Sequence, residues 1–102
     1  MTKTYIRTID ELGRLLIPVK IRRELQFEAY QEVEITIEYG KICIKKYEQQ
    51  DIKKVPYLGM IRALDKQDRL VIPRDYMRVC KIERYREVEI SLVGEKIEIS
   101  ID

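Results

Sequence analysis

Arginine is the residue type whose number and spacing in this sequence could do chemistry. Its guanidinium group stays charged near neutral pH and offers a planar fork of N–H donors that matches two oxygens of a phosphate. Such a set could bind nucleic acid, but a set of solvated surface charges explains it equally well. The candidate residues fall in two stretches of similar spacing, and they are Arg7, Arg14, Arg22, Arg23, Arg62, Arg69, Arg74 and Arg78.

The sequence lacks the side chains that most kinds of catalytic or metal site need. The chain has no histidine, which removes the commonest general base and any Ser-His-Asp nucleophile system. Its two cysteines, Cys43 and Cys80, have no CxxC spacing, so we interpret them as reduced packing residues. Asp10 and Asp65 fit turn formation better than acid catalysis. We therefore expect no enzymatic activity, no cofactor and no bound metal.

The composition points to a small protein that is not membrane-bound. The chain has 102 residues, of which 45% are hydrophobic and 37% charged, with a net charge of +2. No segment approaches the roughly 20 apolar residues that span a bilayer, and the N-terminus does not lead into a signal-peptide core. We therefore expect a cytoplasmic protein without a membrane partner.

An internal repeat organises the chain. Residues 6–44 align without a gap on residues 61–99, at a constant offset of 55, and about 17 of the 39 positions are identical. We therefore predict two related units, unit one at residues 1–47 and unit two at residues 59–102, joined by a polar linker at residues 48–58. One unit is too small to bury a core of its own, so we expect the two to pack on each other.

Each unit is predicted to fold as ββαββ. Residues 5–9 and 15–17 are short β-prone runs around a polar turn in which Gly13 suits a positive φ, and Pro18 suits the first turn of a helix. Alternating apolar and acidic residues then predict two strands on either side of a turn at residues 39–40. The equivalent strands of unit two have Val88, Ile90 and Leu92, then Ile97, Ile99 and Ile101, on the inward face. The helices are expected to bury Ile21 and Leu25 in unit one, and Tyr76 and Cys80 in unit two.

Charge is divided in the same way within each unit. The net charge is +3 for residues 1–25, −2 for 26–50, +4 for 51–82 and −3 for 83–102. The first half of each unit is thus basic and the second half acidic. Because DNA repels carboxylates, we expect the acidic strands to face away from any bound DNA.

The residues that carry these features resemble a known family. Residues 7–18, with Asp-x-x-Gly-Arg followed by three apolar residues and a proline, and residues 21–25, with paired arginines, resemble the AbrB/SpoVT type of bacterial transcription regulator. The resemblance covers unit one and, more loosely, unit two. It implies a mainly β fold with short helices, in which two tandem swapped-hairpin units interleave into one β-barrel-like body. Family members are usually homodimers, so a single chain with two units is expected to form an intramolecular pseudo-dimer.

The resemblance also implies which residues face DNA. In unit one these are Arg7, Arg14, Arg22 and Arg23. Unit two departs from the pattern, because Asp68 replaces the turn glycine and Met77 replaces the first of the paired arginines. We therefore expect unit two to bind DNA less strongly, with Arg74 as a partial substitute. Its remaining counterparts of the unit-one arginines are Arg62, Arg69 and Arg78.

Two DNA-binding functions remain open at this point, and an assembly module without DNA binding remains a third if the arginines are spread around the body. The first is a regulator that binds double-stranded DNA at a pseudo-palindromic or AT-rich site. The second is an antitoxin of the MazE type, but such proteins carry a toxin-binding tail, and this sequence ends directly after its last predicted strand. We therefore favour the regulator, and leave open whether pseudo-dimers associate further.

Overall fold

The computed structural model describes residues 3–47 and 59–101 and contains the predicted order of elements. The proposed linker at residues 48–58 lies outside these ranges, and the unit boundaries stay a prediction. Neither described helix has the length and apolar character needed to cross a bilayer. The elements are β1 (Thr4–Thr8), β2 (Arg14–Leu16), α1 (Val19–Glu24), β3 (Glu32–Glu38), β4 (Lys41–Lys46), β5 (Met60–Ala63), β6 (Arg69–Val71), α2 (Arg74–Val79), β7 (Glu87–Val93) and β8 (Lys96–Ser100).

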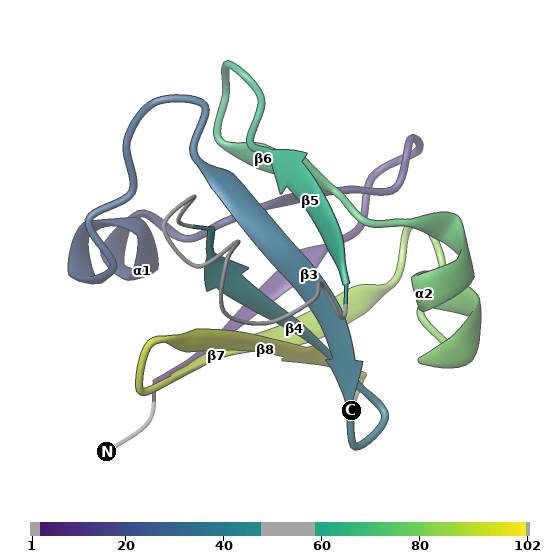
Figure 1. The fold of residues 1–102 in the computed structure, drawn as a ribbon. Coiled ribbons are helices and arrows are strands. Elements are labelled where there is room, and N and C mark those ends of the chain that lie inside the picture. Colours follow the sequence, from purple (N-terminus) through teal and green to yellow (C-terminus); the bar gives the residue numbers. More distant parts are fainter. Residues whose placement is uncertain (1–2, 48–58, 102) are drawn as a thin grey trace.

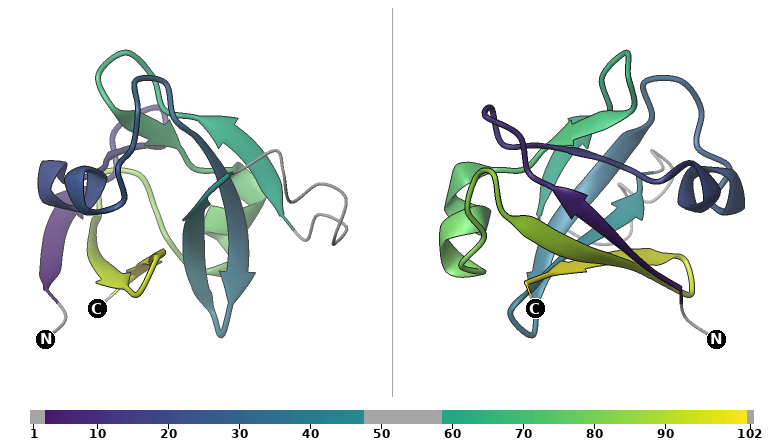
Figure 2. Two further views of the ribbon diagram at one scale, coloured as in Figure 1. Left: turned by 60° about the vertical axis from the view of Figure 1, so that its left-hand side comes forward. Right: turned by 180° about the vertical axis from the view of Figure 1, so that it is seen from behind.

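The strands form two sheets that interleave the two halves of the chain (Figure 1). The larger sheet has six antiparallel strands in the order β1-β7-β8-β4-β3-β5, and the smaller pairs β2 with β6. Strand β1 therefore pairs with β7, and β5 with β3, so the first strand of each half completes the sheet of the other. This exchange confirms the predicted swapped-hairpin fold, and the views in Figure 2 show it from two further sides.

The strand register reveals a pseudo-two-fold axis. Leu15 lies opposite Leu70 in the smaller sheet, and Cys43 lies opposite Glu98 where β4 meets β8. Both pairs differ by 55 in number, which is the offset of the sequence repeat. The axis therefore passes through both pairs, and it relates residue n of unit one to residue n + 55 of unit two.

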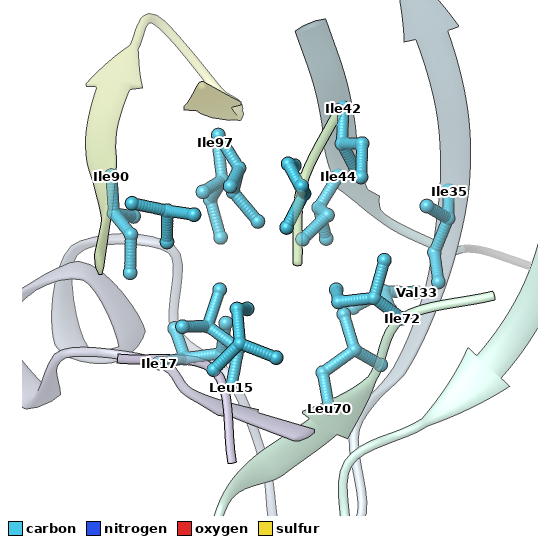
Figure 3. Close-up of a cluster of buried hydrophobic side chains, with 14 of the residues drawn as sticks. Leu15, Ile17, Val33, Ile35, Ile42, Ile44, Leu70, Ile72, Ile90 and Ile97 are labelled. Carbon is cyan, nitrogen blue, oxygen red and sulfur yellow. The ribbon is translucent and has the colours of Figure 1, made fainter. Parts of the chain in front are cut away.

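The core lies between the two sheets and draws on both units. Figure 3 shows Leu15, Ile17, Leu70 and Ile72 on one side, facing side chains from the second hairpin of each unit. The side chains that face them from the larger sheet include Val33, Ile35, Ile42, Ile44, Ile90 and Ile97, and all of these are fully buried. Without its partner, each unit would leave this apolar surface in water, which explains why two units are needed.

Each helix has six residues, or about 1.7 turns, and is flanked at both ends by residues that do not continue it. The helices begin directly after Pro18 and Pro73, and Gln26 and Lys81, just beyond their ends, have left-handed backbones with φ of 57° and 59°. In unit one, the predicted Ile21 is buried and Leu25 packs against the core from a partly buried position.

In unit two, Cys80 is buried as predicted, and Tyr76 packs against the core from a partly buried position, as Leu25 does in unit one. The burial of Met77 and the exposure of Ile101 were not predicted. Met77 turns inward because it packs beside Gly13 of unit one, a contact that the spacing within one helix does not reveal. Ile101, predicted to point inward, lies beyond the end of β8 and is 42% exposed, because it has no cross-strand neighbour there.

Candidate nucleic-acid interface

The outer face of the β2–β6 sheet carries two arginines and two apolar side chains around the pseudo-two-fold axis. Leu15 and Leu70 point into the core, so their neighbours along each strand point outward. Arg14 lies opposite Val71, and Leu16 lies opposite Arg69. Leu16 and Val71 are 43% and 48% exposed, which leaves apolar surface between the two guanidinium groups.

An aspartate holds Arg14 in place from the preceding turn. Oδ1 of Asp10 accepts hydrogen bonds from the backbone N–H groups of Leu12 and Arg14, at 2.9 and 2.8 Å. Its Oδ2 accepts a third from Nε of Arg14 at 2.6 Å. Partial desolvation alone would raise the pKa of Asp10, but these hydrogen bonds outweigh it and hold the pKa below its usual value.

Unit two repeats this arrangement. Oδ1 of Asp65 accepts from the backbone of Gln67 and Arg69 at 2.8 and 2.9 Å, and Oδ2 accepts from Nε of Arg69 at 2.9 Å. The backbone hydrogen bond from Arg69 is the main reason that the pKa of Asp65 is lowered. In both units the aspartate occupies the inner Nε, and the two terminal guanidinium nitrogens have no acceptor among the described residues.

The turns that follow these aspartates differ in sequence but share a backbone. Gly13 has a φ of +78°, as predicted, and its counterpart Asp68 has a φ of +63°. Aspartate tolerates this left-handed region better than most residues do, so the loss of glycine does not change the turn. The Asp68 carboxylate instead accepts a hydrogen bond from Nη1 of Arg22 at 2.8 Å.

Arg22 is therefore tied to the contact between the two units. Its Nε donates to the carbonyl of Ile17 at 2.9 Å, and its side chain is only 22% exposed. The neighbouring Arg23 is exposed and makes no ion pair with a described residue. Of the two arginines in the helix of unit one, Arg22 thus lies at the contact between the units and Arg23 lies at the surface.

Arg7 and Arg62 lie at equivalent positions on the outermost strands of the larger sheet. Nη1 of each donates to the backbone carbonyl of the preceding residue at 2.8 Å. The Arg7 guanidinium also lies over the ring of Tyr5, 5.8 Å from its centre, and its side chain is half-buried. Arg62 is exposed.

The helix of unit two borders a groove beside Gly13 that is lined by both basic and acidic side chains, the acidic ones being Glu11 and Glu83. Arg74 and Arg78 line it, together with Arg84, which sequence reasoning did not single out. Arg84 reaches across the unit boundary, where Nη1 donates to the carbonyl of Glu11 at 3.1 Å. Leu16 and Val71 were missed as well, although strand alternation from Arg14 and Arg69 places them on the same face.

The outer face of the larger sheet has a different character. Lys41 pairs with Glu98 at 3.4 Å, and Lys96 pairs with Glu38 at 3.2 Å, both across the unit boundary. Cys43 lies among these side chains and is 1% exposed, and burial, with help from nearby carboxylates, raises the pKa of its thiol. Cys43 and Cys80 are both free and buried. Glu38 and Glu98 of the second hairpins therefore lie on a face separate from the β2–β6 sheet.

Two interleaved hairpin units with a basic, two-fold-related face define a swapped-hairpin β-barrel protein. Residues 6–51 match the family described as antidote-toxin recognition MazE, bacterial antitoxin. This match lies in the first half of the chain and covers a little under half of its residues, so it shows a similarity of that half to the AbrB/MazE/SpoVT superfamily.

Two curated proteins of Bacillus subtilis are also similar to part of the chain. Transition state regulatory protein AbrB of Bacillus subtilis is 43% identical over 42 residues, which are 41% of this chain and 44% of AbrB. Abh of the same organism, named as a candidate transition state regulator, is 34% identical over 47 residues, or 46% of this chain and 51% of Abh. The chain thus spans about half the length of each relative.

A solved structure resembles the chain along most of its length. The solution structure of PHS018 from Pyrococcus horikoshii aligns with a TM-score of 0.50 and 26% identity. The alignment covers 94% of this chain and 84% of that chain, so the likeness extends through both units.

Proposed function

We propose that this protein is a DNA-binding transcription regulator of the AbrB type. The observation that carries the proposal is the pair of arginines on the β2–β6 sheet, each held by an aspartate at Nε with its terminal nitrogens left for a ligand. Two such forks related by a two-fold axis suit the two strands of a DNA duplex, whose backbones are related in the same way.

The remaining arginines extend this surface. We propose that Arg7, Arg23 and Arg62 contact phosphates from the outermost strands and from α1, and that Arg74 and Arg78 do so from α2. Arg22 contributes by holding the turn of unit two, since its guanidinium is already bound to Asp68. The prediction that unit two binds less strongly relied on Met77 in place of Arg22, but Arg22 is bound to Asp68, so this difference gives no reason for weaker binding by unit two.

Leu16 and Val71 would lie over base edges if the arginines contact the flanking phosphates. Apolar side chains offer no hydrogen bond to a base, but in the major groove they favour the 5-methyl group of thymine. The proposed preference is therefore for sites with thymine at the centre.

A salt titration of DNA binding tests the proposed function. Each lost phosphate contact should flatten the log–log dependence of affinity on salt by about 0.9, so Arg14→Ala with Arg69→Ala should flatten it by about 1.8. Lys41→Ala with Lys45→Ala removes as many positive charges from the other face and should leave the slope nearly unchanged. Absence of salt-dependent binding by the wild type at low ionic strength would refute the proposal.

The matched family description supports a second candidate, the DNA-binding part of a toxin–antitoxin pair. This function requires a toxin whose growth arrest is relieved when this chain is expressed with it. If the product of a neighbouring gene arrests growth and this chain restores it, the antitoxin function replaces that of a free regulator.

A further inference from the structure

The pseudo-two-fold axis allows the two units to be compared contact by contact. The strand pairings between unit one and unit two have counterparts in the opposite direction, 55 residues away in each partner. In a pair of identical units, a contact from the first unit to the second and its counterpart from the second to the first would involve the same side chains. In this chain they differ at several sets of equivalent positions, among them one beside the turns and one on the axis.

The first difference lies where the helix of one unit meets the turn of the other. In one direction Arg22 binds Asp68 at 2.8 Å, and the two side chains are 22% and 33% exposed. In the other direction the equivalent residues are Met77 and Gly13, and a Cβ placed on Gly13 would lie 3.5 Å from Sδ of Met77. One contact is thus an ion pair and its counterpart is apolar.

These side chains suit each other only when unit one meets unit two. Two copies of unit one would place Arg22 against a glycine in both directions, and the half-buried guanidinium would lose its carboxylate. Two copies of unit two would place Met77 against Asp68 in both directions, leaving a partly buried carboxylate against an apolar side chain. A charge that loses its partner in such a position is destabilising.

The second difference lies on the axis itself. Cys43 is directly opposite Glu98, which binds Lys41 of the other unit at 3.4 Å. Two copies of unit two would bring Glu98 directly opposite a second Glu98, with Lys96 in the place of Lys41, and like charges directly opposite each other destabilise a sheet. Two copies of unit one would remove the carboxylate that Lys41 binds.

We propose that the two halves have diverged into complementary partners, so that each half accepts the other and disfavours a copy of itself. The kind of partner that fits each surface is therefore the opposite unit, in the same chain or in a second copy. The proposal concerns pairing alone and is independent of DNA binding. It explains why Asp68 and Met77, the two departures from the family pattern, occur together.

A double-mutant cycle in the full-length chain tests the first contact. Arg22→Met leaves methionine facing Asp68, as two copies of unit two would. Asp68→Asn leaves Arg22 facing a neutral residue, as two copies of unit one would, while an asparagine still tolerates the left-handed backbone. Each single change should lower the urea midpoint, and the double variant should be more stable than additivity predicts, with a coupling of about fivefold in the folding equilibrium constant.

The matched control is the cycle of Arg78→Met and Asp75→Asn. This pair lies within one helix at 3.8 Å and is highly exposed, so its coupling should be close to one. Additive effects of the Arg22 and Asp68 changes would overturn the proposal, because the pair would then contribute nothing to the choice of partner.

If Arg22→Met is too unstable to measure, a second set of variants tests the proposal at the pseudo-two-fold axis, where Cys43 lies opposite Glu98. Cys43→Glu should lower the urea midpoint more than Cys43→Gln, which has the same size and no charge. Adding Glu98→Gln should then raise the midpoint of the Cys43→Glu variant, although the same change should lower that of the wild type. An equal effect of Glu98→Gln in both backgrounds would overturn the proposal.

Discussion

At the scale of single residues, Asp10 and Asp65 connect the turn to the arginines. Each aspartate caps backbone amides with one oxygen and holds a guanidinium Nε with the other. This double use explains why an acidic residue belongs four positions before an arginine that is proposed to bind a polyanion. The aspartate reduces the local positive charge, but it fixes the direction of the guanidinium fork.

The Asp10→Asn variant distinguishes the effect of the carboxylate's charge from its effect on the position of Arg14, because the two change the affinity for DNA in opposite directions. If only charge mattered, removing a carboxylate beside DNA would strengthen binding. If the aspartate positions Arg14, binding should weaken by about fivefold, because a charge-assisted hydrogen bond is lost. Fluorescence anisotropy with a labelled duplex measures the change, and Asp75→Asn serves as a control for an exposed aspartate. Tighter binding by Asp10→Asn would rule out the positioning role.

Leu16 and Val71 give a second prediction at this scale. The wild type should bind poly(dA-dT) more tightly than poly(dA-dU), by about fourfold for each thymine methyl group that it buries. Leu16→Ala with Val71→Ala should remove most of this difference without changing the salt slope. Val79→Ala, at an exposed position on α2, should retain it. Equal affinity of the wild type for both polymers would contradict methyl recognition while leaving phosphate binding intact.

At the scale of elements, the join between β5 and β3 depends on a glycine. A Cβ on Gly59 would overlap the backbone carbonyl of Ile35, and its φ is not in the left-handed region. Gly59→Ala should therefore push the two strands apart and destabilise the fold by about 2 kcal/mol. Urea denaturation measures this loss. Gly94→Ala is the control, because its Cβ meets open space and only its φ of +64° carries a cost, of about 1 kcal/mol.

At the scale of the whole molecule, both halves of the core belong to one chain. If the swap is intramolecular in solution, the urea midpoint should not change over a hundredfold range of protein concentration. A chain-exchanged dimer would instead gain about 2.7 kcal/mol of apparent stability over that range. Light scattering at the lowest concentration should give the mass of one chain, and a dimeric mass there would show exchange between chains.

Much of this architecture could be predicted from local patterns. The repeat, the strand alternation and the prolines before each helix predicted the order of elements, and the β-prone runs 5–9 and 15–17 lie within one residue of β1 and β2 at each end. The Asp-x-x-Gly-Arg turn predicted a positive φ at Gly13, which the structure has. The pattern could not predict that Asp10 would bind Arg14 at Nε, because that geometry depends on the closed turn.

The sequence by itself determined that the chain is a duplicated unit, that each unit folds as ββαββ, and that basic and acidic residues separate within it. These features follow from spacing along the chain, which governs turns, strand faces and helix ends. Only the tertiary structure decided where Arg22, Met77 and Cys43 lie. Each faces a residue of the other unit about 46 to 64 positions away, and the choice between surface and interior depends on that distant neighbour.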